Sequence, residues 1–80
     1  MTTKTLMQLK RNEKGRVIGF DAGSAMQIRL ESMGIRRGKI ISRISSQLLG
    51  GPIVVSIDGR QTAMGRNMAA RILIEAGDID

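Results

Sequence analysis

The segment 24–38 constrains the fold of this chain more than any other. Ser24 followed three residues later by Gln27 is a capping-box pattern, which predicts that a helix begins there and ends near residue 33. The apolar residues of this segment share one helical face at positions i, i+4 and i+7: Met26, Leu30 and Met33. The sequence therefore predicts one short helix that buries a single apolar stripe.

Glycines at the end of this helix predict how the chain leaves it. Gly34 can adopt the left-handed conformation that ends a helix, and Ile35 can then fold back onto the last turn. Gly38 supplies a second turn into a strand that begins at Lys39. Because the rest of the chain is typical of β-strands, we expect the helix to cover a small sheet.

Alternating apolar residues and turn pairs predict the strands. Five strands are expected over residues 16–21, 39–46, 53–57, 60–64 and 71–75. Asp58-Gly59 is the pair that a type I′ hairpin requires, and Gly19 inside the first strand indicates a bulge. Val17, Ile18 and Phe20 are expected to carry the burial of that strand. The predicted fold class is mainly β, a small SH3-like barrel of about five strands with one short α-helix inserted after the first strand.

The remaining segments are expected to be short connections. Residues 1–4 are polar and are expected to be loose, and Leu6, Met7 and Leu9 are expected to form a lid over the barrel end. Residues 46–52 contain Gly-Gly-Pro and predict a loop, residues 65–70 predict a single helical turn, and residues 76–80 form an acidic tail.

Composition restricts the chemistry that the chain can perform. The 80 residues include no cysteine and no histidine, which excludes disulfides and the usual transition-metal ligands other than carboxylates. The acidic residues are dispersed along the chain: Glu13, Asp21, Glu31, Asp58, Glu75, Asp78 and Asp80. The serines and threonines have no histidine to activate them, and no P-loop pattern is present. We therefore expect no catalytic residue, no metal site and no cofactor.

The net charge of +6 indicates an anionic partner, which could be nucleic acid, an acidic protein surface or an anionic membrane face. Phe20 is the single aromatic residue of the chain, which disfavours binding that depends on bases stacking on rings. No apolar run approaches the roughly 20 residues of a membrane-spanning helix. Residues 1–4 are not followed by the apolar region of a secretion signal, so we expect a cytoplasmic protein without direct membrane insertion.

The candidate contact residues are basic or exposed and apolar. Cationic residues cluster at 10–16 and again at 36–39, and the two clusters would form a positive rim if they converge in space. Ile28 lies opposite the apolar stripe of the helix, so it is expected to face water. A solvated surface with no contact role remains an alternative for each of these features. The predicted partner-binding residues are Ile28, Arg29, Arg36, Arg37, Leu48 and Leu49.

Ordered sequence pieces along nearly the whole chain carry a family resemblance. They are Gly15-Arg16-Val17, Arg29-Leu30-x-x-Met33-Gly34-Ile35-x-x-Gly38, Gly51-Pro52-Ile53-x-Val55, Asp58-Gly59, Ala63-Met64 and Ala69-x-x-Ile72-x-Ile74. In this order they resemble the FeoA family, the small cytoplasmic companions of the FeoB ferrous-iron transporter. The resemblance implies one SH3-like domain over residues 1–80. It also implies a non-enzymatic adaptor that regulates ferrous iron uptake by binding the cytoplasmic GTPase region of a FeoB-type transporter.

The chain departs from the family pattern at the turn after the helix, where Arg36-Arg37 stands in place of the usual proline. Smaller departures fall at Met64 and at Asn67-Met68. The turn is a candidate contact. We therefore expect the residues that meet the partner at this turn to differ from those of the family pattern.

Three alternatives remain open at this level. The first is a basic small barrel that binds nucleic acid, whose affinity would fall steeply with salt. The second is the SH3-like regulatory domain of an iron-dependent repressor, which would need an attached DNA-binding region. The third concerns assembly rather than function: the chain could form a weak homodimer, which is compatible with the adaptor function.

Overall fold

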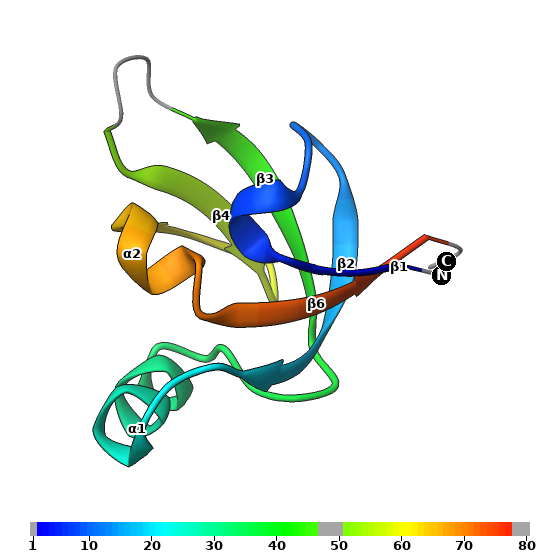
Figure 1. Cartoon of the computed structure of the whole chain (residues 1–80). Helices are drawn as coiled ribbons and strands as arrows, with labels where there is room; N and C mark the ends of the chain where they lie inside the picture. Colours follow the sequence, from blue (N-terminus) through cyan, green and yellow to red (C-terminus); the bar gives the residue numbers. More distant parts are fainter. Residues whose placement is uncertain (1, 47–50, 78–80) are drawn as a thin grey trace.

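The computed structural model describes residues 2–46 and 51–77, and its strands form one antiparallel sheet in the order β1-β6-β2-β3-β4-β5 (Figure 1). The sheet curls around a common core, and the longer helix covers one end of it (Figure 1). The elements in chain order are β1 (Thr2–Thr5), η1 (Leu6–Gln8), β2 (Lys14–Phe20), α1 (Ser24–Ser32), β3 (Ile40–Ser46), β4 (Ile53–Ile57), β5 (Arg60–Met64), α2 (Arg66–Ala69) and β6 (Ile72–Ala76).

The β1 strand corrects the prediction for the N-terminal segment, which was expected to be loose. It pairs antiparallel with β6, from Thr2 opposite Ala76 to Thr5 opposite Leu73. Three of its four residues are threonines, whose branched side chains favour the strand conformation once a partner edge is available. The sheet therefore has six strands rather than five, and α1 follows the second strand rather than the first.

Alternation along the strands builds the core as predicted. On β4, Ile53, Val55 and Ile57 are buried, and on β6, Ile72 and Ile74 are buried. Burying one such side chain fully contributes about 1.5–3 kcal/mol relative to leaving it in water. The buried core as a whole comprises Leu6, Leu9, Val17, Leu30, Ile35, Ile41, Ile53, Val55, Ile57, Met64, Ala69, Ile72, Ile74 and Ala76.

The predicted lid is confirmed by the burial of Leu6, the first residue of η1, and of Leu9, which follows it. The predicted hairpin is confirmed too, because Asp58 and Gly59 both have positive φ, 52° and 77°, as a type I′ turn requires. The single helical turn after β5 is present as α2.

The start of α1 differs in detail from the capping-box prediction. Gly23 is the N-cap, and Ser24 lies inside the first turn. Gln27 reaches back past both and donates from Nε2 to the carbonyl oxygen of Ala22 at 2.7 Å. Gln27 therefore holds the loop before the helix, and the serine makes no capping hydrogen bond.

The end of α1 follows the prediction. Gly34 has a φ of 88°, and its N–H donates to the Glu31 carbonyl at 3.0 Å. The N–H of Ile35 donates to the Leu30 carbonyl at 3.1 Å, which completes a Schellman motif. Leu30 and Ile35 are both buried, so this motif fixes the direction in which the chain returns to the sheet.

Among the helices in the described ranges, none is long and apolar enough to cross a bilayer. The predicted loop over residues 46–52 includes residues 47–50, which lie outside the described residues, so Leu48 and Leu49 receive no structural account.

Candidate protein-contact surface

The turn between α1 and β3 is bonded to β2 through two main-chain hydrogen bonds. The N–H of Gly38 donates to the Val17 carbonyl at 2.8 Å, and the N–H of Val17 donates to the Lys39 carbonyl at 2.9 Å. Gly38 has a φ of 91°, a conformation that favours glycine over other residues. These contacts hold the Arg36-Arg37 turn against the second half of β2.

Two arginine side chains pack across this junction. Arg16 donates from Nη1 to the Gly38 carbonyl oxygen at 3.0 Å, which ties β2 to the turn a second time. The guanidinium of Arg37 lies over the ring of Phe20, 5.9 Å from the ring centroid. A cation–π contact at an exposed site is worth about 0.5–1 kcal/mol, so Arg37 is oriented without being neutralised.

The Arg37 side chain lies beside Gly19 of β2. A Cβ added to Gly19 would lie 3.8 Å from Nε of Arg37, which is ordinary contact distance. The β2–β6 register also shifts between Val17 and Gly19, which confirms the predicted bulge.

Ile18 is the extra residue in that bulge, and 39% of its surface is exposed. The prediction that Ile18 contributes to the core is therefore wrong, because the bulge turns it away from the inner face. Phe20 is half-buried. We call the surface formed by Arg16, Ile18, Phe20, Arg36 and Arg37 the arginine face.

The two predicted basic clusters converge only in part. Arg16 joins the turn at Arg36 and Arg37, whereas Lys10 and Arg11 lie in the turn before β2. That turn is bonded instead to β3, through Asn12 N–H to the Arg43 carbonyl at 2.6 Å. The Lys39 side chain is not part of the cluster either, because its Nζ lies 3.0 Å from Asp58 Oδ2 in the β4–β5 hairpin.

The structure places Ile28 and Arg29 on the outer side of α1. Ile28 is 66% exposed, which confirms that it faces water. Arg29 is exposed as well, and its carbonyl accepts a hydrogen bond from Ser32 Oγ at 2.6 Å. A contact role for these two residues stays a prediction.

The predicted partner-binding residues did not include Ile18 or Arg16, although Arg16 belongs to the predicted basic cluster at residues 10–16. The signal for Ile18 was available in Gly19, because a bulge there displaces the residue before it. The contact of Arg16 with the turn left no signal in the sequence, because its hydrogen-bond acceptor lies 22 residues further along the chain.

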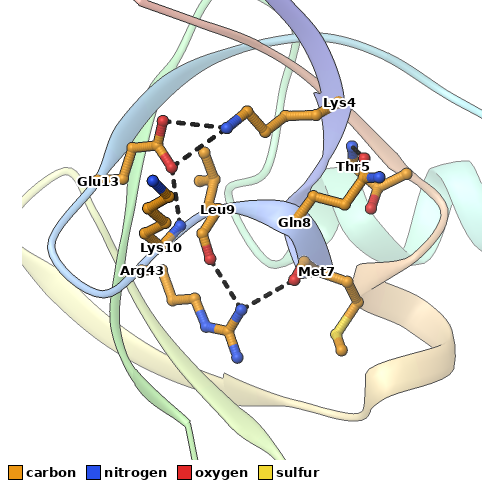
Figure 2. Close-up of polar contacts among 8 residues, drawn as sticks. All are labelled: Lys4, Thr5, Met7, Gln8, Leu9, Lys10, Glu13 and Arg43. Atoms are coloured by element: carbon orange, nitrogen blue, oxygen red, sulfur yellow. Dashed lines mark hydrogen bonds and ion pairs between the residues drawn. The ribbon is translucent and has the colours of Figure 1, made fainter.

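A separate polar cluster ties the N-terminal segment to the sheet (Figure 2). Lys4 Nζ lies 3.1 Å from Glu13 Oε2, and the main-chain N–H of Lys10 donates to Glu13 Oε1 at 2.8 Å. The Lys10 hydrogen bond, together with the charge of Lys4, lowers the pKa of Glu13. Arg43 donates from Nη1 to the carbonyls of Met7 and Leu9 at 2.9 and 2.8 Å, which holds the lid in place.

Three of the five carboxylates in the described ranges lie near cations of the same chain. Besides Glu13 and Asp58, Asp21 lies 3.9 Å from Arg71 Nη1. Within residues 2–46 and 51–77, no three carboxylates gather in a group that could hold a metal ion. An open hollow of about 560 Å³ lies beside the Asp21–Arg71 pair and is also lined by Met26, Asn67 and Ala70.

The curled antiparallel sheet with its lid and covering helix defines a small SH3-like β-domain whose notable surface is cationic. The chain belongs to the FeoA domain family, whose model matches residues 4–76. A curated relative from Methanocaldococcus jannaschii, named "Putative Fe(2+) transport protein A", is 38% identical over 66 residues, which are 82% of this chain and 78% of the relative.

Solved structures of FeoA proteins share this fold. The crystal structure of an iron uptake regulatory protein, FeoA, matches with a TM-score of 0.85 and 28% identity over 94% of this chain and 97% of that one. The NMR structure of a FeoA-like protein from Clostridium acetobutylicum matches with the same TM-score and identity over 95% and 90% of the two chains. The SH3-like prediction for the fold is thereby confirmed.

Proposed function

We propose that this chain is a cytoplasmic, non-enzymatic adaptor that regulates ferrous iron uptake by binding the GTPase region of a FeoB-type transporter. Membership of the FeoA domain family supports a role in iron uptake. The name of the relative from Methanocaldococcus jannaschii supports ferrous iron as the transported ion. The chain acts by contact in this proposal, and the iron passes through the transporter.

The observation that carries the proposal is the arginine face. Its apolar residues, Ile18 and Phe20, lie on β2 with Arg16, and the Arg37 guanidinium is oriented by its contact with the Phe20 ring. Protein interfaces commonly combine an apolar centre with a polar rim, and arginine is enriched in them. The transporter surface that fits this face is acidic around an apolar patch. Such charge complementarity accelerates association and weakens as salt rises.

Calorimetric titration of the GTPase region of a FeoB-type transporter with this chain tests the proposal. We expect binding that weakens as sodium chloride is raised, and an affinity reduced by about tenfold or more in the Arg36→Ala/Arg37→Ala variant. The matched control is Lys10→Ala/Arg11→Ala, which removes the same charge from the turn before β2 and should change the affinity by about twofold or less. Absence of binding with GTP, with GDP and without nucleotide would overturn the proposal.

Nucleic-acid binding is the second candidate, favoured by the net charge of +6 and by the arginines of the arginine face. Non-specific binding of this kind depends on phosphate contacts, so its affinity falls steeply with salt. Mobility-shift titrations with single-stranded and double-stranded RNA and DNA separate the two functions. Binding at physiological salt that needs Arg36 and Arg37, without binding to the GTPase region, would replace the adaptor proposal.

A further inference from the structure

The β5 strand has one edge that carries no partner in the described part of the chain. It is the last strand in the sheet order and is hydrogen-bonded along one side only, to β4. Ile57 lies opposite Arg60 across the two-residue turn, and such turns place the flanking residues in a hydrogen-bonded pair. The main-chain groups of Arg60, Thr62 and Met64 therefore point toward β4.

The groups of Gln61 and Ala63 point the other way as a consequence. Both residues are exposed, and no described residue makes a main-chain hydrogen bond to either one. Their two N–H and two C=O groups form a short, open hydrogen-bonding edge. An open strand edge is a template for pairing with another strand unless charge, proline or covering chain protects it.

The other edge strand of the sheet, β1, is protected from pairing with another chain, whereas β5 is not. β1 carries Lys4, a charged residue whose ammonium group turns to Glu13 in the neighbouring turn. β5 has no proline, no lysine and no bulge in its pairing with β4. Its only charged residue is Arg60, at the hairpin end.

We propose that two copies of this chain associate by antiparallel pairing of β5 with β5 of the second copy, about a two-fold axis at Thr62. In that register Gln61 lies opposite Ala63 of the second copy, and Ala63 opposite Gln61, so the four outward groups of each copy satisfy those of the other. The two Thr62 side chains meet on the axis, and cross-strand threonine pairs are favourable.

The charges nearest the β5 edge fit a second copy as the occupant. The two Arg60 residues are offset by four residues along the strands, about 13 Å, which exceeds the Debye length of about 8 Å at physiological salt. The Asp58-Gly59 turn of one copy comes beside the Gly65-Arg66 corner of the other, which brings opposite charges together. The net charge of +6 on each copy opposes association, so the dimer should be weak and should strengthen as salt rises.

A cysteine placed on the axis tests this register directly, because the natural chain has no cysteine. The two copies of residue 62 would form a non-hydrogen-bonded pair of the antiparallel ladder. The Cα atoms of such a pair lie within the separation that a disulfide needs. We expect oxidised Thr62→Cys to form a covalent dimer of twice the 8.7-kDa chain, several times faster than the matched control Ser32→Cys on the exposed side of α1. Equal rates for the two variants would overturn the proposal.

A second variant tests whether dimerisation depends on the β5 edge or on another part of the surface. Gln61→Pro removes an outward N–H, a substitution that edge strands tolerate, whereas Gln61→Thr keeps it. In sedimentation equilibrium we expect the wild type and Gln61→Thr to dimerise at high concentration and Gln61→Pro to remain a monomer. Arg36→Ala/Arg37→Ala should dimerise normally, so this result is independent of transporter binding.

Amide exchange in the wild type provides a readout that needs no variant. The amides of Gln61 and Ala63 should exchange more slowly as the chain concentration rises. Exchange that is independent of concentration, or a dimer that persists in Gln61→Pro, contradicts the proposal. Protection of these amides only by the transporter's GTPase region would assign the edge to that partner and would also contradict it.

Discussion

Lys4 and Glu13, nine residues apart in the chain, form an ion pair of 3.1 Å that joins β1 to the turn before β2. The same carboxylate accepts the main-chain N–H of Lys10, so one side chain closes the turn and holds the edge strand. Figure 2 shows this pair beside the Arg43 contacts that hold the lid. The N-terminal segment is thereby fixed at two points.

The first prediction concerns pH. The folded state lowers the pKa of Glu13 below the ordinary value of a glutamate side chain, so the ionised carboxylate stabilises the fold. This contribution is complete above the unfolded pKa and is lost as pH falls through the lower, folded pKa. For an exposed pair we expect about 1 kcal/mol or less.

The Glu13→Gln variant should accordingly be less stable than the wild type near pH 7, and the difference should shrink toward pH 3. Urea unfolding at both pH values measures it. Ser32→Ala, an exposed change on α1 that alters no titratable group, is the control and should differ from the wild type equally at both pH values. A constant difference between Glu13→Gln and wild type at the two pH values would contradict the linkage.

The second prediction concerns Arg43. Its Nη1 is the donor to both the Met7 and Leu9 carbonyls, and replacing it with alanine leaves these groups without their partner. We expect Arg43→Ala to cost about 1–3 kcal/mol, with faster hydrogen exchange in β1 and η1 than in β4. Arg11→Ala serves as the control, because that exposed arginine lies in the adjacent turn. Hydrogen exchange that becomes uniformly faster in all strands would contradict a local stabilising role of Arg43.

The third prediction concerns Gly15, which lies against Ile74 where β2 pairs with β6. A Cβ on Gly15 would collide with Cγ2 of Ile74, a branched side chain in the packed core. Gly15→Ala should therefore destabilise the chain by about 1–3 kcal/mol in thermal or urea unfolding. At Gly23 a Cβ would meet nothing within 4 Å, so Gly23→Ala should cost clearly less. Equal costs at the two positions would contradict the packing argument.

The fourth prediction separates the exposed and buried sides of α1. Ile28→Ser should leave the free energy of unfolding within about 0.5 kcal/mol of the wild type, because the side chain is 66% exposed. Leu30→Ala, two residues on, removes a fully buried side chain and should cost about 2–5 kcal/mol. If Ile28 contacts the transporter, its serine variant should also bind the GTPase region more weakly than wild type while folding normally.

Local patterns in the sequence predicted much of this fold. The alternation along β4 and β5 and the Asp58-Gly59 pair between them are contained in twelve consecutive residues, and the structure has the predicted hairpin. The glycine stop after α1 is equally local, because the Schellman motif uses only neighbouring residues. Such features depend on backbone conformation and on the spacing of side chains, both of which can be read from the sequence.

Only the tertiary structure decided the features that depend on distant partners. Residues 2–5 form a strand because β6, about seventy residues away, offers an edge to pair with. Ile18 is exposed because of the register of β2 against β6, and Arg16 joins Arg37 because Gly38 returns to β2. The sequence by itself determined the helix, the hairpin, the net charge and the family pattern. Which cations form one face was decided by the packing of the sheet, since contacts between distant residues leave no periodic signal along the chain.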